Sequence, residues 1–205
     1  VLTPTGCPAR IPALGANPFP PGERVILFLG SLAANHMAEM INQAARKLAG
    51  RARIHLVGLN KTQLYGPRAE LDPLIIVHRE RPEEEVWDFI RWADLGLALA
   101  TGRLAFDNDV SKIYNYLRGG LPVLSEAPIL QNKLIRETGL GAVFKFGDGD
   151  DLVAQALKLL AHPPAGRERV MAFMAQSHSW ETRVETYVRL MKDILGPAFH
   201  DSKGR

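Results

Sequence analysis

Residues 25–58 read VILFLGSLAANHMAEMINQAARKLAGRARIHLVG, and this stretch decides the fold class. It holds two apolar runs on either side of a helical stretch, and a glycine closes each run. The two runs and the helical stretch are Val25 to Leu29, Ile54 to Val57 and Met37 to Leu48. Short apolar runs that alternate with helices are typical of the buried strands of a parallel sheet. We therefore interpret the stretch as one strand, helix, strand unit of an α/β domain.

The same alternation continues as far as Leu160. Further apolar runs lie at Leu74 to Val77, Leu95 to Leu99, Pro122 to Leu124 and Ala142 to Phe144. Helical stretches lie between or after them at Pro82 to Trp92, Ser111 to Arg118, Ile129 to Glu137 and Asp151 to Leu160. The sequence predicts a doubly wound, Rossmann-like parallel sheet of about six strands, with helices on both faces and more helices at the C-terminal end. Trp87 and Trp92 are interpreted as core residues.

The chain ends in two predicted helices, roughly Arg167 to Gln176 and Trp180 to Leu195. Apolar residues of the second helix recur at intervals that place them on one face, and they are Trp180, Val184, Tyr187, Val188, Met191 and Leu195. Such a face must pack on something. We expect it to cover the sheet of this domain, and the alternative is that its distal end reaches a neighbouring domain that the chain lacks.

The first segment, Val1 to Gly22, differs in composition from the rest. Its prolines remove backbone donors and disfavour both helix and central strand, and they are Pro4, Pro8, Pro12, Pro18, Pro20 and Pro21. We interpret residues 1–22 as a linker or arm from a missing N-terminal domain, because the chain starts in this sequence and without a methionine. Residues 23–196 are then the folded domain, and residues 197–205 are a disordered tail.

The bulk composition excludes several classes of function. With 205 residues, 46% of them hydrophobic and 23% charged, the chain can bury one sizeable core. Its 25 basic and 22 acidic residues are mixed and give a net charge of +3, too little to indicate a nucleic-acid partner. The single Cys7 forms no internal disulfide, and no apolar run approaches the roughly 20 residues needed to cross a bilayer. We expect a soluble, cytoplasmic domain, with association at the inner face of the membrane only through the missing part.

Ligands of an open parallel sheet bind beyond the carboxyl ends of its strands, where loops and helix N-termini converge. The first loop there runs from Gly30 to His36, and its small residues let the backbone approach a phosphate near the free N–H groups of the next helix. The loop has neither the G-x-G-x-x-G spacing of dinucleotide folds nor the G-K-[ST] ending of a P-loop. The alternative is that Ser31 or Asn35 acts simply as a helix cap.

The second loop, His78 to Pro82, follows the third predicted strand. Arg79 and Arg81 could face phosphates, and the Glu80 carboxylate could accept hydrogen bonds from a base or a sugar. A mixed-charge loop that caps the following helix explains the same residues.

The third segment, Thr101 to Pro122, is the most informative. After a polar loop that includes Asp107, a short helix is expected to begin at Ser111 and to end at two glycines. Lys112 then lies in the first turn, where the helix dipole disfavours a cation unless an anion binds at the same place. Asn115, one turn on, shares the face of Lys112 and offers donor and acceptor groups that suit ribose hydroxyls.

From Lys112 the chain reads KIYNYLRGGLPVL, which resembles the segment K-x-x-E/N/Q-Y-x-x-x-G-x-P-V in the C-terminal domain of glycosyltransferases of the two-domain GT-B fold. Val1 to Gly6 resembles the linker that enters this domain, and His178 to Glu181 resembles the h-S-W-e that opens its terminal helix. These likenesses cover nearly the whole chain in order. The resemblance, which is closest to bacterial polysaccharide glycosyltransferases, implies transfer of a sugar from a UDP- or GDP-linked donor to a glycan or lipid-linked acceptor.

The resemblance also implies a set of donor-site residues. They are Gly30, Ser31, Arg79, Glu80, Asp107, Ser111, Lys112 and Asn115. The diphosphate is expected near the first loop and Lys112, and the base against the second loop. Many members carry a pair of glutamates, the second of which binds ribose, at the positions held here by Asp107 and Asn115. The retaining stereochemistry that accompanies that pair and the identity of the general base therefore stay open.

The sequence implies no cofactor beyond the nucleotide sugar, and no metal. Asp107 to Asp109 spells D-x-D, the metal-binding signature of a different glycosyltransferase fold, but such pairs are common by chance, and the histidines show no paired ligand spacing. Two other readings are a non-catalytic nucleotide-binding or scaffolding module with a degenerate donor site, and an NAD-dependent enzyme, whose glycine fingerprint is lacking. Because no general base is evident, we expect this chain alone to bind a nucleoside diphosphate weakly and to transfer nothing.

Overall fold

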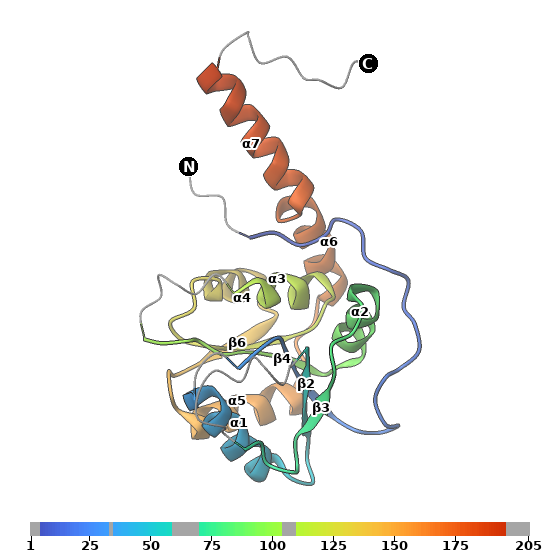
Figure 1. Ribbon diagram of the computed structural model, residues 1–205, viewed down its shortest axis with the longest axis vertical. Helices are drawn as coiled ribbons and strands as arrows, with labels where there is room; N and C mark the ends of the chain where they lie inside the picture. The colour runs from blue at the N-terminus through green and yellow to red at the C-terminus, as the bar shows by residue number, and fades with distance from the viewer. Residues whose placement is uncertain (1–4, 33–34, 59–69, 104–109, 196–205) are drawn as a thin grey trace.

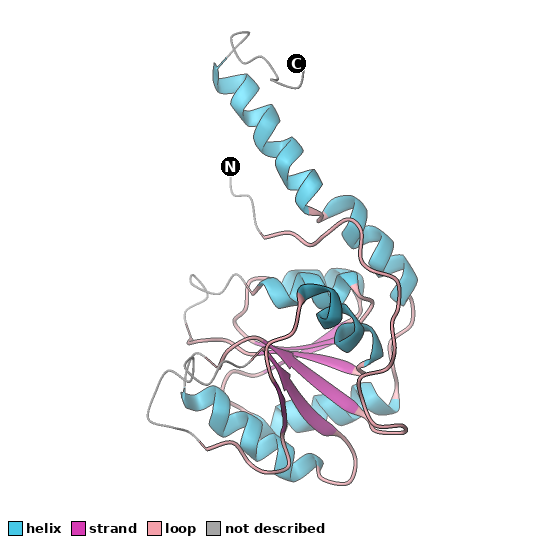
Figure 2. Ribbon diagram, turned by 45° about the vertical axis from the view of Figure 1, so that its right-hand side comes forward, coloured by secondary structure: helices cyan, strands magenta, loops and turns pink. Residues whose placement is uncertain are grey.

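A computed structural model of the chain describes residues 5–32, 35–58, 70–103 and 110–195. The strands of this part are β1 (Val25–Leu29), β2 (Arg53–Val57), β3 (Ile76–His78), β4 (Leu95–Ala98), β5 (Val123–Glu126) and β6 (Gly141–Phe144). The helices are α1 (Asn35–Leu48), α2 (Glu83–Trp92), α3 (Ser111–Arg118), α4 (Asn132–Thr138), α5 (Gly149–Ala161), α6 (Arg167–Ser177) and α7 (Trp180–Leu195). Figure 2 shows the strands as one twisted sheet between layers of helices, so the predicted α/β class is confirmed.

The strands of the described chain form one six-stranded sheet in the order β3-β2-β1-β4-β5-β6, and every pairing is parallel. The chain builds outward from β1 to β2 and β3 and then returns to the other side of β1 with β4. The strand order therefore reverses between β1 and β4. In doubly wound sheets this point, at the carboxyl ends of the two strands, is where ligands bind.

Alternating side chains of β1 divide the core into two layers. Ile26 and Phe28 pack with α1 and α5 on one face, and Leu27 and Leu29 pack with α2, α3, α4 and α6 on the other. All five residues of β1 are buried. Such a central strand must be apolar on both faces, which is why VILFL could be recognised as a strand from sequence.

The described part of the predicted arm, residues 5–22, forms neither helix nor strand and is tied to the domain by side chains. Arg118 of α3 donates to the carbonyl oxygens of Pro8 and Ala9 at 3.0 and 2.6 Å. Phe19 is buried, with its ring edge against the rings of His55 and Phe89. The arm thus covers part of the α2 side of the core.

The prediction for Trp92 is wrong. Trp87 is buried as expected, but Trp92 is 40% exposed, at the last turn of α2. Its indole N–H donates to the Gly15 carbonyl oxygen at 3.1 Å, so the ring lies under the arm and not under the sheet. The arm supplies the missing cover because Asp88, one turn earlier, also accepts from the Gly15 N–H at 2.7 Å.

The expectation that the last helix covers the sheet is also wrong. Figure 1 shows α7 projecting away from the sheet and its helices. No residue of α7 is buried, and its exposed large apolar residues are Trp180, Val184, Tyr187, Met191, Ile194 and Leu195. The physical reason is that α2, α3 and α4 already cover this face, with α6 packed on α3. The last helix begins where Cys7 bridges Ser179, beyond that layer.

Candidate ligand site at the switch point

The candidate site begins at the end of β1. Gly30 follows the strand with φ of 91°, a conformation that favours glycine, and its N–H donates to the Val57 carbonyl oxygen at 2.8 Å. The chain therefore turns sharply away from the sheet towards α1. Ser31 is half-buried at this turn, and its side chain forms no hydrogen bond within the described residues. These two predicted residues thus lie beside the point between β1 and β4 where the strand order reverses, which we call the switch point.

The hydroxyl of Tyr116, on α3, lies between β1 and β4 at this place and bonds to both strands. This fully buried hydroxyl accepts from the Leu29 N–H at 2.9 Å and lies 3.2 and 3.3 Å from the carbonyl oxygens of Leu27 and Leu97. These backbone groups belong to the two strands, so the hydroxyl bridges them beyond their last paired residues. The ring can pass only because Gly96 has no side chain, since a Cβ there would lie 2.6 Å from the ring. The tyrosine of the Lys112 segment thus fixes the carboxyl ends of β1 and β4. We call the region beside these ends, where doubly wound sheets bind ligands, the crevice.

The helix α3 begins at Ser111, as predicted, and it follows β4, so its N-terminus lies at the carboxyl edge of the sheet. Ser111 is exposed, and the preceding Val110 makes no side-chain capping bond. Within the described residues, the backbone N–H groups of Ser111 and Lys112 have no acceptor. Uncapped N–H groups at the positive end of a helix dipole favour an anion.

Lys112 lies in the first turn of α3, and its ammonium group sits over the Phe28 ring of β1, 4.1 Å from the ring centroid. Burial lowers the pKa of Lys112 to about 8. No carboxylate of the described residues forms an ion pair with it. Asn115, one turn later, is half-buried. Among the described residues, this desolvated amine is therefore held by the Phe28 ring and by no carboxylate.

Glu126, at the end of β5, is a site residue that sequence reasoning missed. Its carboxylate is fully buried and accepts from two backbone N–H groups, that of Ala100 at 2.8 Å and that of Gly147 at 2.7 Å. Burial raises the pKa of Glu126, whereas the two amide donors and nearby His36 act in the opposite direction. An acid two residues after the apolar run that ends at Leu124 was the signal available in the sequence.

Three side chains meet beside this carboxylate. The Phe146 ring lies 5.6 Å from the His36 ring, and the Arg103 guanidinium lies 5.7 Å from the Phe146 centroid. His36, in the first turn of α1, also donates from Nε2 to the Ala100 carbonyl oxygen at 3.0 Å. The turns that follow β4 and β6 thus contact the start of α1. They lie at the carboxyl edge of the sheet, on the β5 and β6 side of the crevice, and we call the side chains of Arg103, Phe146 and His36 the wall.

The predicted base loop lies at the same sheet edge but farther away. Arg79 and Glu80 directly follow β3, and both are exposed. The strand β3 is two places from β1, a separation of roughly 10 Å. An extended nucleoside diphosphate could span that distance. Asp107, the remaining predicted residue, lies outside the described residues.

His78 ends β3 and belongs to a buried relay that the sequence did not indicate. Its Nε2 lies 2.9 Å from Nδ1 of His55, and Nε2 of His55 lies 2.8 Å from the Glu23 carboxylate. Since a carboxylate only accepts, His55 donates to Glu23 and accepts from His78. Burial lowers the pKa of both histidines.

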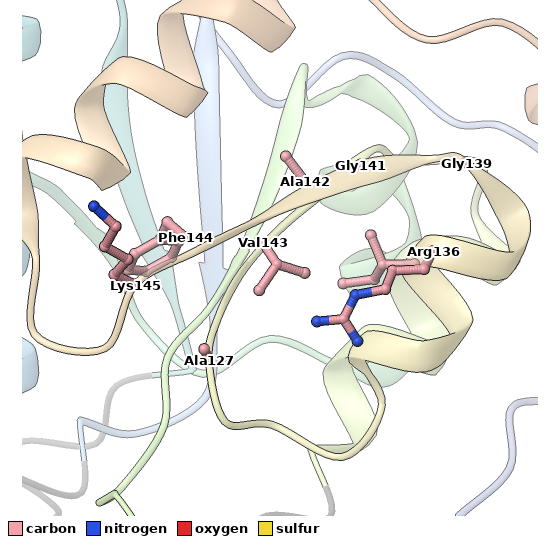
Figure 3. A pocket seen from close by; sticks show the side chains of 9 residues that line it. Ala127, Arg136, Gly139, Gly141, Ala142, Val143, Phe144 and Lys145 are labelled. Carbon is pink, nitrogen blue, oxygen red and sulfur yellow. The ribbon is translucent and has the colours of Figure 1, made fainter.

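A cavity of about 610 Å³ lies elsewhere, between β6 and α4. Figure 3 shows Val143 of β6 and the guanidinium of Arg136 beside this hollow. The other lining residues are Ala127, Ile135, Gly139, Gly141, Ala142, Phe144 and Lys145. Since Arg136 and Lys145 are its only ionisable groups, it lacks the convergent polar groups of the switch point, and we assign the candidate site to the latter.

Two features of the described residues bear on other classes of function. Among them, no three His, Cys, Asp or Glu side chains gather in a way that could hold a metal ion. None of the helices within these residues is both long enough and apolar enough to span a bilayer.

Solved structures resemble this chain over most of its length. A sucrose-phosphate synthase from Thermosynechococcus elongatus is 17% identical with a TM-score of 0.69, over 94% of this chain and 52% of that one. A glycosyltransferase from Rickettsia africae is 12% identical with a TM-score of 0.70, over 87% and 50%. A structure described as a UDP-N-acetylglucosamine 2-epimerase from Listeria monocytogenes is 15% identical with a TM-score of 0.53, over 85% and 46%.

The chain thus spans about half the length of the structures that it matches. No protein-family model matches it, and no curated protein sequence does. At these identities the likeness concerns the fold and not the chemistry. The chain therefore has the Rossmann-like α/β fold of one half of a GT-B glycosyltransferase.

Proposed function

We propose that the chain is the nucleotide-sugar-binding half of a glycosyltransferase, which transfers a sugar from a UDP- or GDP-linked donor to a glycan or lipid-linked acceptor. The observation that carries the proposal is the desolvated ammonium group of Lys112 in the first turn of α3, beside the point where the strand order reverses. A buried amine without a carboxylate partner is costly unless an anion binds to it.

A diphosphate meets the chemistry of this crevice. The N–H groups of Ser111 and Lys112, the dipole of α3 and the Lys112 ammonium all favour negative charge at one place. During transfer, negative charge builds up on the leaving nucleoside diphosphate. Groups fixed in advance around that charge stabilise the transition state more than they stabilise the bound donor. The crevice would thus assist departure of the nucleotide, and the chemistry proposed for it uses no metal.

The remaining predicted residues receive roles from their positions. Asn115 is proposed to bind the ribose, because it lies one turn from Lys112. Arg79 and Glu80 are proposed to bind the base, at the end of β3. Asp107 is proposed to lie near the donor, as the resemblance implies. Gly30 and Ser31 are proposed to let the diphosphate approach the backbone.

We further propose that the acceptor and the general base belong to a second α/β domain. The observation behind this is the exposed apolar face of α7, which the described residues leave uncovered. We propose a cytoplasmic location, with membrane association only through that other domain and with no nucleic-acid partner.

Calorimetric titration of the chain with UDP and with GDP tests the donor site. We expect binding of one of the two nucleotides, and we expect Lys112→Ala to abolish it. Lys158→Ala is the matched control, because Lys158 is exposed near the far end of α5. No binding at millimolar UDP or GDP would contradict the proposal and favour a scaffolding module. Sugar transfer by this chain alone would contradict the assignment of the general base to a second domain.

A further inference from the structure

Glu126 joins two loops of the crevice that are far apart in sequence. One carboxylate oxygen accepts from the N–H of Ala100, two residues after β4, and the other accepts from the N–H of Gly147, in the turn after β6. The strand β5, which carries Glu126, lies between β4 and β6 in the sheet. The side chain therefore reaches across both neighbouring strand ends at the carboxyl edge.

The acid is itself firmly held. Its main-chain oxygen accepts from the Asn132 side-chain amide at 3.1 Å, and the residue has no exposed surface. Both partners are N–H donors, so two acceptor oxygens are needed on one side chain. A carboxylate supplies them, whereas an amide of the same shape supplies only one and would aim an NH₂ group at the other donor.

The two loops carry Arg103 and Phe146, whose side chains contact each other in the wall. Arg103 follows Ala100 in the chain, and Phe146 precedes Gly147. Arg103 lies over the Phe146 ring, and Phe146 contacts His36 at the start of α1. The positions of this wall thus depend on the two hydrogen bonds to Glu126 and on the bond from His36 to Ala100.

We propose that Glu126 is a positioning residue, which holds the Ala100 and Gly147 loops so that Arg103, Phe146 and His36 form one wall of the donor crevice. The proposal rests on the proposed function, because its consequence is measured as nucleotide affinity. Glu126 does not touch the ligand. A free carboxylate in this place would repel a phosphate, and its engagement by two amide donors keeps it turned into the protein.

The test compares three variants in titrations with whichever of UDP or GDP the unaltered chain binds. Glu126→Gln removes one acceptor at constant shape, and we expect affinity to fall on the order of tenfold or more. Phe146→Ala removes a half-buried ring that contacts Arg103 and His36, and we expect a loss of affinity of similar size. Thr138→Val is the matched control, because Thr138 is buried at the opposite edge of the sheet and donates to the Leu134 oxygen at 2.7 Å. It should lower the melting temperature without changing affinity.

Amide hydrogen exchange gives a second readout that does not depend on the ligand. In Glu126→Gln, exchange at Ala100 or Gly147 should accelerate selectively, whereas exchange in the central strand β1 should stay slow. If both Glu126→Gln and Phe146→Ala bind as tightly as the unaltered chain, the positioning role is refuted while the proposed function stands. If the unaltered chain binds neither nucleotide, both proposals fail. If Glu126→Gln does not fold, the Phe146→Ala result alone decides.

Discussion

The hydroxyl of Tyr116 gives the sharpest stability prediction, because it replaces backbone pairing between two central strands. In Tyr116→Phe the ring stays in place, and only the oxygen is lost. The N–H of Leu29 then loses its acceptor at 2.9 Å, inside the core. The carbonyl oxygens of Leu27 and Leu97 lose a donor that they share, at 3.2 and 3.3 Å.

The size of the effect follows from these partners. A buried backbone N–H without an acceptor costs about 1–3 kcal/mol. The shared donor adds less, because one hydroxyl proton serves two oxygens that each have a second lone pair. We expect the free energy of unfolding to fall by about 2–3 kcal/mol in total. For a domain of this length, about 2–4 °C per kcal/mol gives a drop in melting temperature of roughly 4–12 °C.

Thermal and urea unfolding of Tyr116→Phe measure this loss, and hydrogen exchange locates it. The Leu29 amide should exchange faster, while the amide of Ile26, within the paired part of β1 and β4, should remain protected. A loss of less than about 0.5 kcal/mol would be that of an ordinary surface substitution. That result would show that the Tyr116 hydroxyl does not join the two strands beside the crevice.

Three further predictions concern the same sheet. Gly96→Ala should destabilise the chain by about 1–3 kcal/mol in urea unfolding, because its Cβ would lie 2.6 Å from the Tyr116 ring; unchanged stability would show that the ring is free to move. Because burial lowers the pKa of His55 and His78 below the ordinary 6.5, the unfolded chain binds protons more readily, so stability should be full above pH 6.5 and fall below it. His55→Gln should reduce that dependence in pH-resolved melting curves, and an unaltered slope would exclude this pair as its source. Lys112→Met should raise the stability of the ligand-free chain by about 1 kcal/mol or more, and a lower melting temperature would mean that the amine already has a partner.

Local patterns were enough to predict the sheet and the start of α3. Apolar runs on both faces of β1 and the glycines after the strands are properties of neighbouring residues, and the same is true of the two glycines that end α3. The strand predicted at Leu74 to Val77 is found at Ile76–His78. Leu74 and Val77 are both exposed, so this apolar run does not mark buried positions. The apolar run thus located the exposed edge strand β3 less accurately than the buried central strand β1.

Pairings between distant residues could not be predicted. Tyr116 bonds Leu29 across 87 positions and Glu126 bonds Ala100 across 26, and neither residue type signals its partner. The errors at Trp92 and α7 have the same origin. An amphipathic pattern shows that a helix has an apolar face, but segments elsewhere decide what lies against that face. The arm lies over Trp92, and α6 packs on α3 where α7 was expected.

The central claim is that a diphosphate binds at the N-terminus of α3, and a crystal structure of the chain with bound UDP or GDP tests it most directly. We predict phosphate oxygens within about 3 Å of the Lys112 ammonium group and of the Ser111 N–H, with the base towards Arg79. A nucleotide found instead in the cavity between β6 and α4 would contradict the claim.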